Sequence, residues 1–258
     1  MTRNILITLM CFGLLSACST GKSNNDAAVE EDVDALYNKA ADALDAEQYT
    51  SAIRYFEDVE RQFPYSKWAT QAQLMAAYAY YEAQRYDEAI VALDRFIQLH
   101  PGNDDVDYAH YLRALCYYEQ ISDVRRDQYL TQQASDAFDT LIRRFPDSKY
   151  ARDAKLKKDL AQDHLAGKEM EIGRYYLVRG ETNAAINRFR TVVEKYQTTT
   201  HAAEALHRLV EAYMTLGLTA EATQVAAVLG YNYPGRVWYE RSFELLDDES
   251  RQKILEER

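Results

Sequence analysis

The chain has 258 residues, of which only 9 are glycine and 4 are proline. Tight turns between strands depend on these two residue types, so the composition excludes a strand-rich sandwich or barrel. The formal net charge of −11 disfavours a nucleic-acid-binding surface, because binding to a phosphate backbone needs a positive field. Hydrophobic residues make up 47% of the chain, which fits a folded body rather than a disordered one.

The first 17 residues are typical of a signal peptide. A basic start precedes an apolar run over 5–15, which is shorter than the roughly 20 residues needed to span a bilayer. The run ends in Leu15-Ser16-Ala17-Cys18, which resembles the bacterial lipobox, where the cysteine thiol accepts a lipid. We therefore expect cleavage before Cys18 and lipidation of this residue. The alternative is an ordinary signal peptide with an incidental cysteine.

The lipobox also implies a location. In enterobacteria-like sorting, an aspartate after the lipidated cysteine retains a lipoprotein at the inner membrane, and this chain has Ser19 there. We expect a lipid-anchored protein on the periplasmic face of the outer membrane. Residues 18–32 are small, polar and acidic, which predicts a flexible tether between the lipid and the folded part.

The rest of the chain repeats one helical pattern. Each of the four prolines follows an alanine by twelve residues, and in a fifth copy Gln197 stands in the proline position. The alanines are Ala52, Ala89, Ala134, Ala185 and Ala222. Mostly apolar residues recur four, seven and eleven positions after each alanine, which is the spacing of one helix face. A proline ends this helix because it cannot continue the backbone hydrogen bonding.

A second apolar stripe lies upstream of each alanine and predicts a first helix. Short breaks separate the two helices near 46–48, 84–85, 179–180 and 216–217. The third copy carries extra residues at 119–130. The fourth copy is expected to begin with a longer helix near 150–165.

This helix–turn–helix unit resembles the tetratricopeptide repeat, whose length is about 34 residues. We predict an all-α fold, an α-solenoid of about five tetratricopeptide-like helical hairpins with a C-terminal helix. Residues 33–149 would hold the N-terminal repeats 1–3, and residues 150–236 the C-terminal repeats 4–5. Residues 237–258 are expected to form a capping helix, because the end of a repeat stack needs a polar outer face. A partner-binding tail is the alternative.

The sequence carries no motif of a catalytic or metal site. Its five histidines form no HExxH or HxH pattern, and CxxC, GxSxG, GxGxxG and Walker A motifs are absent. We predict no enzymatic activity, no metal and no cofactor. Cys116 lies in an apolar stretch and is expected to be a buried structural thiol. A periplasmic enzyme subunit stays as a rival hypothesis, which predicts that Cys116→Ala would impair function.

Tyrosine occurs 21 times, often in the predicted first helices, which line the concave surface of tetratricopeptide-like stacks. A tyrosine offers apolar area and a hydroxyl at low entropic cost, which suits a peptide groove. The groove candidates are Tyr37, Leu74, Tyr78, Tyr81, Tyr108, Tyr111 and Tyr118. Core packing is the alternative interpretation, and we expect it for Tyr80, Tyr117 and Tyr176.

Charge is distributed unevenly along the chain. Residues 18–64 hold 4 basic and 11 acidic side chains, whereas residues 143–158 hold 7 basic and 2 acidic ones. Further arginines follow at 174, 179, 188 and 190. The basic half is either a solvated face or a docking patch for an acidic partner, where charge mainly sets orientation and association rate.

The lipobox at Cys18, the polar tether and the five repeats together resemble the BamD family, lipoproteins of the machinery that assembles β-barrels in the outer membrane. Five stretches carry the resemblance: 48–53 (QYTSAI), 77–81 (AYAYY), 92–101 (ALDRFIQLHP), 103–111 (NDDVDYAHY) and Asn187-Arg188.

This resemblance implies a non-enzymatic receptor and scaffold. The N-terminal repeats would recognise unfolded outer-membrane proteins, and the C-terminal repeats would dock on BamA, the barrel subunit, beside other Bam lipoproteins. Arg188 matches a family arginine at the docking surface, and Arg174 and Arg190 are further docking candidates. Gln197 and the insertion at 119–130 depart from the family pattern. The alternative is another periplasmic repeat lipoprotein scaffold, for example one in cell-envelope biogenesis.

Overall fold

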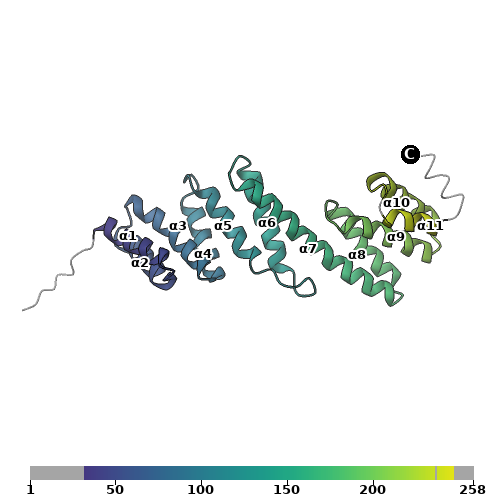
Figure 1. Ribbon diagram of the computed structural model, residues 1–258, viewed down its shortest axis with the longest axis horizontal. Helices are drawn as coiled ribbons and strands as arrows, with labels where there is room; N and C mark the ends of the chain where they lie inside the picture. The colour runs from purple at the N-terminus through teal and green to yellow at the C-terminus, as the bar shows by residue number, and fades with distance from the viewer. Residues whose placement is uncertain (1–31, 236, 247–258) are drawn as a thin grey trace, which may run out of the picture. The chain divides into compact units, whose positions relative to one another are not determined.

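The structure is a computed structural model that describes residues 32–235 and 237–246. Its regular elements within these residues are eleven helices (Figure 1). The first ten form five hairpins: α1 (Val33–Asp45) with α2 (Tyr49–Gln62), α3 (Lys67–Glu82) with α4 (Tyr86–Leu99), α5 (Val106–Tyr118) with α6 (Tyr129–Arg144), α7 (Ala151–Val178) with α8 (Thr182–Lys195), and α9 (Ala202–Thr215) with α10 (Thr219–Asn232). A further helix, α11 (Val237–Leu245), follows. The predicted all-α fold of five hairpins is confirmed.

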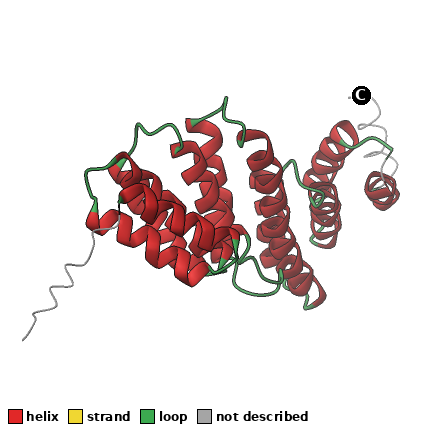
Figure 2. Cartoon of the chain, turned by 60° about the vertical axis from the view of Figure 1, so that its left-hand side comes forward, coloured by secondary structure: helices red, strands yellow, loops and turns green. Residues whose placement is uncertain are grey.

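Each helix packs mainly on its neighbours in chain order, so the hairpins stack side by side. Figure 2 shows helices and loops alone among the described residues. α11 packs on α9 and α10, and Leu246 is buried there against Val210 and Ala222. The predicted signal peptide, the tether up to residue 31 and the part of the expected capping helix over 247–258 lie outside the described residues. The division into N-terminal and C-terminal repeats stays a prediction.

The five repeat alanines occupy equivalent positions at the hairpin contacts. All five are fully buried, with 0% of their surface exposed. Four residues after the alanine, Phe56, Leu93, Phe138 and Phe189 are also fully buried. Burying one such large apolar side chain contributes about 2–3 kcal/mol. The small residue therefore allows close helix contact, and the large one fills the space beside it.

The second helix of every hairpin ends in the same way. Both partners of the last hydrogen bond are counted from the repeat alanine. The amide of the eleventh residue after this alanine donates to the carbonyl of the seventh, as in Phe63 to Val59 at 3.0 Å and Tyr196 to Val192 at 2.9 Å. A proline follows in four copies, but Gln197 follows Tyr196. Since the fourth copy ends identically, proline is compatible with this helix end but not required for it.

The turn inside four hairpins is a C-terminal helix cap with one residue in the left-handed region. That residue is Glu47, Gln84, Gly180 or Gly217, with φ of 57°, 58°, 76° and 73°. The next amide donates back five residues, for example Arg85 to the Tyr80 carbonyl at 2.9 Å. Glycine adopts this conformation without steric cost, whereas glutamate and glutamine do not.

The change Gln84→Gly should therefore raise the free energy of unfolding by about 0.5–1 kcal/mol, because it removes the left-handed strain of a side-chain-bearing residue. Urea denaturation of the folded chain measures this. Gln98→Gly is the matched control, because Gln98 is exposed inside α4, where glycine should cost about 1 kcal/mol. A loss of stability in both variants would contradict the assignment of the turn.

The third and fourth hairpins depart from the regular unit. α7 has 28 residues, twice the length of α8, so the helix predicted near 150–165 is continuous with the first helix of the fourth hairpin. The insertion between α5 and α6 packs back onto α7. Lys168 Nζ donates to the Arg125 carbonyl at 2.7 Å, and Val124 lies against Gly167. The insertion thus braces the middle of α7.

Candidate functional site

Five tyrosines from α3, α5 and the start of α7 form one surface. We call Tyr78, Tyr81, Tyr108, Tyr111 and Tyr150 the tyrosine surface, and all five are partly exposed. The Tyr111 ring stacks on Tyr150 at 4.9 Å, and Tyr108 lies 5.3 Å from Tyr150 between ring centroids. Tyr78, Tyr81 and Tyr108 pack against one core cluster, which residues of α3, α4 and α5 build. The five tyrosines therefore gather on α3, on α5 and at the start of α7.

The hydroxyls of Tyr78, Tyr81, Tyr108 and Tyr111 have a raised pKa and stay protonated at neutral pH. A hydrogen bond to Glu82, followed by burial, raises the pKa of Tyr78 to about 12. Burial raises the pKa of Tyr81 to about 12. Burial is also the main cause that raises the pKa of Tyr108 and Tyr111, and the Tyr111 hydroxyl donates to the Asp153 carboxylate. The surface offers ring faces for apolar side chains and hydroxyls for main-chain amides and carbonyls.

Of the other groove candidates, Tyr118 packs against the same core cluster as Tyr111 and Tyr150. Tyr118 is two turns along α5 from Tyr111, with its ring 6.0 Å from Phe138 and the Lys157 ammonium 5.9 Å above it. Tyr37 on α1 packs against Phe56 on α2 and Trp68 at the start of α3, so the structure does not bring it into the tyrosine surface.

Leu74 is 2% exposed and packs in the core between the second and third hairpins. A ligand at the surface cannot reach its side chain, so we leave it out of the proposed site. Tyr150 was missed by the sequence analysis because it precedes α7 and lies outside the repeated stripe.

The three candidate arginines are each held by a different carboxylate. Arg188 on α8 pairs with Glu169 on α7 at 3.1 Å, and Arg174 on α7 pairs with Glu204 on α9 at 3.0 Å. Arg190 pairs with Glu194 within α8 at 3.3 Å.

Part of the basic stretch at 143–158 is neutralised in the same way. Arg143 and Lys158 both contact Asp139, and the Lys158 hydrogen bond is the main cause that lowers the pKa of this carboxyl.

Arg190 borders an apolar groove that the sequence analysis did not predict. The groove runs between α8, α9 and α10, with a volume of about 270 Å³ that continues into a second hollow of about 380 Å³. Val193, Leu206 and Val228 line both parts. Three helices from two hairpins build it, so no single stripe in the sequence reveals it.

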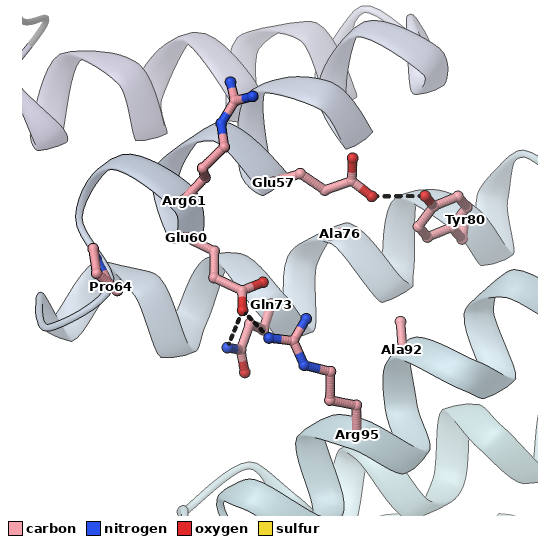
Figure 3. Close-up of a pocket in the computed structure, with 9 residues that line it drawn as sticks. All are labelled: Glu57, Glu60, Arg61, Pro64, Gln73, Ala76, Tyr80, Ala92 and Arg95. Carbon is pink, nitrogen blue, oxygen red and sulfur yellow. Dashed lines mark hydrogen bonds and ion pairs between the residues drawn. The ribbon is translucent and has the colours of Figure 1, made fainter.

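A hollow of about 520 Å³ lies at the equivalent place between the first two hairpins (Figure 3). The two hollows differ at the positions five and eight residues after the repeat alanine. These positions hold Glu57 and Glu60 in the hollow between the first two hairpins, and Arg190 and Val193 in the apolar groove. Glu60 accepts hydrogen bonds from Gln73 at 2.9 Å and from Arg95, and the Tyr80 hydroxyl donates to Glu57 at 2.7 Å. The same cleft of the repeat is thus polar at one end of the stack and apolar at the other.

One buried cluster has the residue types of a hydrolytic triad. His207 Nδ1 lies 2.9 Å from Ser242 Oγ, and its Nε2 lies 3.4 Å from Glu211. Ser242 is fully buried, so a substrate cannot reach its hydroxyl, and the cluster joins α11 to α9. Cys116 is likewise fully buried, and burial raises the pKa of its thiol to about 12.

The described residues contain no group of three or more histidine, cysteine, aspartate or glutamate side chains placed to hold a metal ion. No helix in the same part of the chain has the length and apolar character that crossing a membrane requires.

The stacked hairpins, their buried alanines and their shared helix ends define a repeat protein of the tetratricopeptide class. Among solved structures, a thermophilic tetratricopeptide-repeat protein from Thermus thermophilus is similar, with a TM-score of 0.39 and 16% identity over 83% of this chain and 98% of that one. The chain belongs to the family whose model is described as YfiO, outer membrane lipoprotein, which matches residues 29–229. The resemblance to the BamD family is confirmed.

Curated relatives carry the name outer membrane protein assembly factor BamD. One from Caulobacter vibrioides is 50% identical over 92% of this chain and 78% of its own length. One from Rickettsia prowazekii is 47% identical over 94% and 96%, and one from Neisseria meningitidis serogroup A is 38% identical over 90% and 92%.

Proposed function

We propose that this chain is a subunit of the outer-membrane β-barrel assembly machinery. It recognises unfolded outer-membrane proteins on the tyrosine surface and docks on BamA through its C-terminal repeats. Lipid at Cys18 attaches it to the periplasmic face of the outer membrane, beside other Bam lipoproteins. Family membership supports the role in assembly, and the names of the curated relatives point the same way.

The tyrosine surface is the observation that carries substrate recognition. An unfolded barrel protein is an extended chain with aromatic side chains and unpaired main-chain groups. The rings of Tyr111 and Tyr108 lie 4.9 and 5.3 Å from the Tyr150 ring between centroids and provide contact area for the side chains, and the hydroxyls provide hydrogen bonds for the main chain. The scaffold therefore needs no catalytic group to hold its substrate.

Replacing Tyr78 and Tyr150 by alanine should weaken the binding of aromatic-rich peptides from β-barrel proteins at least tenfold, because buried aromatic contacts dominate such interfaces. Fluorescence anisotropy with a labelled peptide measures the change. Tyr129→Ala is the matched control, since Tyr129 is exposed on α6 outside the surface and its removal should leave affinity unchanged. Equal affinity of all variants would refute recognition at this surface.

The charge reversal Arg188→Glu should weaken binding to the periplasmic domains of BamA at least tenfold. It replaces a cation of the proposed docking surface by a carboxylate, and it leaves Glu169 of this chain beside a second negative charge. Surface plasmon resonance measures the affinity. Arg61→Glu is the control, since Arg61 is exposed on α2, lies outside the basic half of the chain and likewise pairs with a carboxylate, that of Asp58. Photo-crosslinking from positions 78 and 188 then separates the two functions, with substrate trapped at the first and BamA at the second.

A further inference from the structure

The N-terminal half of α7 lacks the helix that covers its C-terminal half. In the fourth hairpin α8 packs on Ala166 and Met170, in one core cluster with Phe189. α8 has 14 residues and α7 has 28, whereas the paired helices α3 and α4 have 16 and 14. The face that α8 covers therefore continues for about three to four turns toward Ala151 with no second helix on it among the described residues (Figure 1).

This uncovered face carries apolar side chains. Positions 152, 156, 159 and 163 continue the helical spacing from Ala166 and Met170 toward the N-terminus. Leu156 is 59% exposed, and Leu160, one turn further along, is 58% exposed. The opposite side of the same segment is covered, because Ala154 packs with α6 in the core of the third hairpin.

The charge around these leucines is unbalanced. Arg152 and Lys155 are exposed and form no ion pair with another described residue. The neighbouring Lys157 and Lys158 are already paired, with Asp153 and Asp139. Asp163, at the end of the stripe, accepts hydrogen bonds from the Thr200 amide and hydroxyl at 2.8 Å. A segment that binds this face would meet the two unpaired cations Arg152 and Lys155 beside the two leucines. Asp159 contributes one negative charge to the same face.

We propose that this face, defined by Arg152, Lys155, Leu156 and Leu160, binds an amphipathic helix of a partner protein whose apolar stripe is flanked by carboxylates. The partner helix takes the place that a second helix occupies in a regular hairpin. A helix of about 12 residues matches the open length of about 18 Å. This surface lies outside the tyrosine surface and carries none of the three arginines proposed for BamA docking, so it adds a separate partner site.

The test uses two synthetic helical peptides of about 14 residues with the same leucine stripe, one flanked by glutamate and one by lysine. Fluorescence anisotropy with the full mature chain should show at least tenfold tighter binding of the glutamate peptide. The double change Leu156→Asn/Leu160→Asn should abolish that preference and weaken binding at least tenfold, and Lys155→Glu should shift the preference toward the lysine peptide. Circular dichroism verifies that the variants remain folded.

Leu99→Asn is the matched control, because Leu99 is an exposed leucine, 56% accessible, on α4. It should leave the binding of both peptides unchanged. Equal affinity for the two peptides, or equal losses in the Leu99 and Leu156/Leu160 variants, would overturn the proposal. Binding that appears only after removal of residues 247–258 would overturn it as well, since the occupant would then be this chain's own tail.

Discussion

Replacing Gly173 by alanine should lower the free energy of unfolding by about 2 kcal/mol. Gly173 stands in the first helix of the fourth hairpin, where the ring of Phe189 presses on the α7 backbone. A Cβ at this position would lie 2.8 Å from Phe189 Cδ1 and 2.9 Å from Cζ, closer than real carbon contacts. Phe189 is fully buried, so its ring can move only by disturbing the core, and overpacking of this kind costs about 1–3 kcal/mol.

The second hairpin supplies the compensating change. There Ala77 and Leu93 occupy the positions of Gly173 and Phe189, and both are fully buried. The double variant Gly173→Ala/Phe189→Leu copies this pair and should be more stable than the sum of the single changes by at least about 1 kcal/mol. Urea denaturation of the four proteins measures the coupling. Gly102→Ala is the control, because no atom lies within 4 Å of the added Cβ, and it should change the free energy of unfolding by less than about 0.5 kcal/mol. If the stability changes of Gly173→Ala and Phe189→Leu simply add in the double variant, the packing argument is contradicted.

The repeat was predictable because its signals are local. Small residues at Ala52 and its equivalents, and a helix cap eleven residues later, act within one hairpin and recur in each copy. The structure places all five alanines at 0% exposure, including the copy with Gln197. Helix spacing and backbone hydrogen bonding decide these features, and both can be read from one stretch of chain.

The binding surfaces were only partly predictable, because they depend on how neighbouring hairpins meet. Leu74 and Tyr78 lie four residues apart on α3, yet one is core and the other reaches the surface. Tyr150 joins the tyrosine surface through contacts with Tyr108 and Tyr111, which belong to the preceding hairpin. The grooves between hairpins need three helices each, so their shape and lining follow from packing rather than from a motif.

The buried contact between α9 and α11 leads to the second large expected effect. The His207 ring is 3% exposed, lies against Trp238 at 5.2 Å between centroids, and contacts Ser242 and Glu211 with its two nitrogens. The ring therefore links Ser242 on α11 to Glu211 on α9. Removing the ring leaves a cavity and a buried hydroxyl with no partner in this cluster.

His207→Ala should therefore lower the free energy of unfolding by about 3 kcal/mol and release α11 at lower urea concentration than the rest of the stack. The chain has two tryptophans, Trp68 and Trp238, so a Trp68→Phe background makes the fluorescence of Trp238 a reporter of α11 alone. Circular dichroism reports the remaining helices. Coincident transitions with unchanged midpoints in the variant would contradict a role of His207 in holding α11.

The stability that the Glu211 carboxylate contributes to this contact should depend on pH. The hydrogen bond with His207, together with Arg208, lowers the pKa of Glu211 from 4.5 to about 2. A carboxyl whose pKa is depressed by folding adds stability above its unfolded pKa, and that stability is lost as the pH falls through the folded pKa. The stability difference between the wild-type chain and Glu211→Gln should thus be largest above pH 4.5 and shrink toward pH 2. Glu194→Gln, which removes an exposed carboxylate on α8, is the control, and its free energy of unfolding should follow the wild-type profile against pH. A stability difference between the wild-type chain and Glu211→Gln that stays constant with pH would show that the charge of Glu211 does not matter.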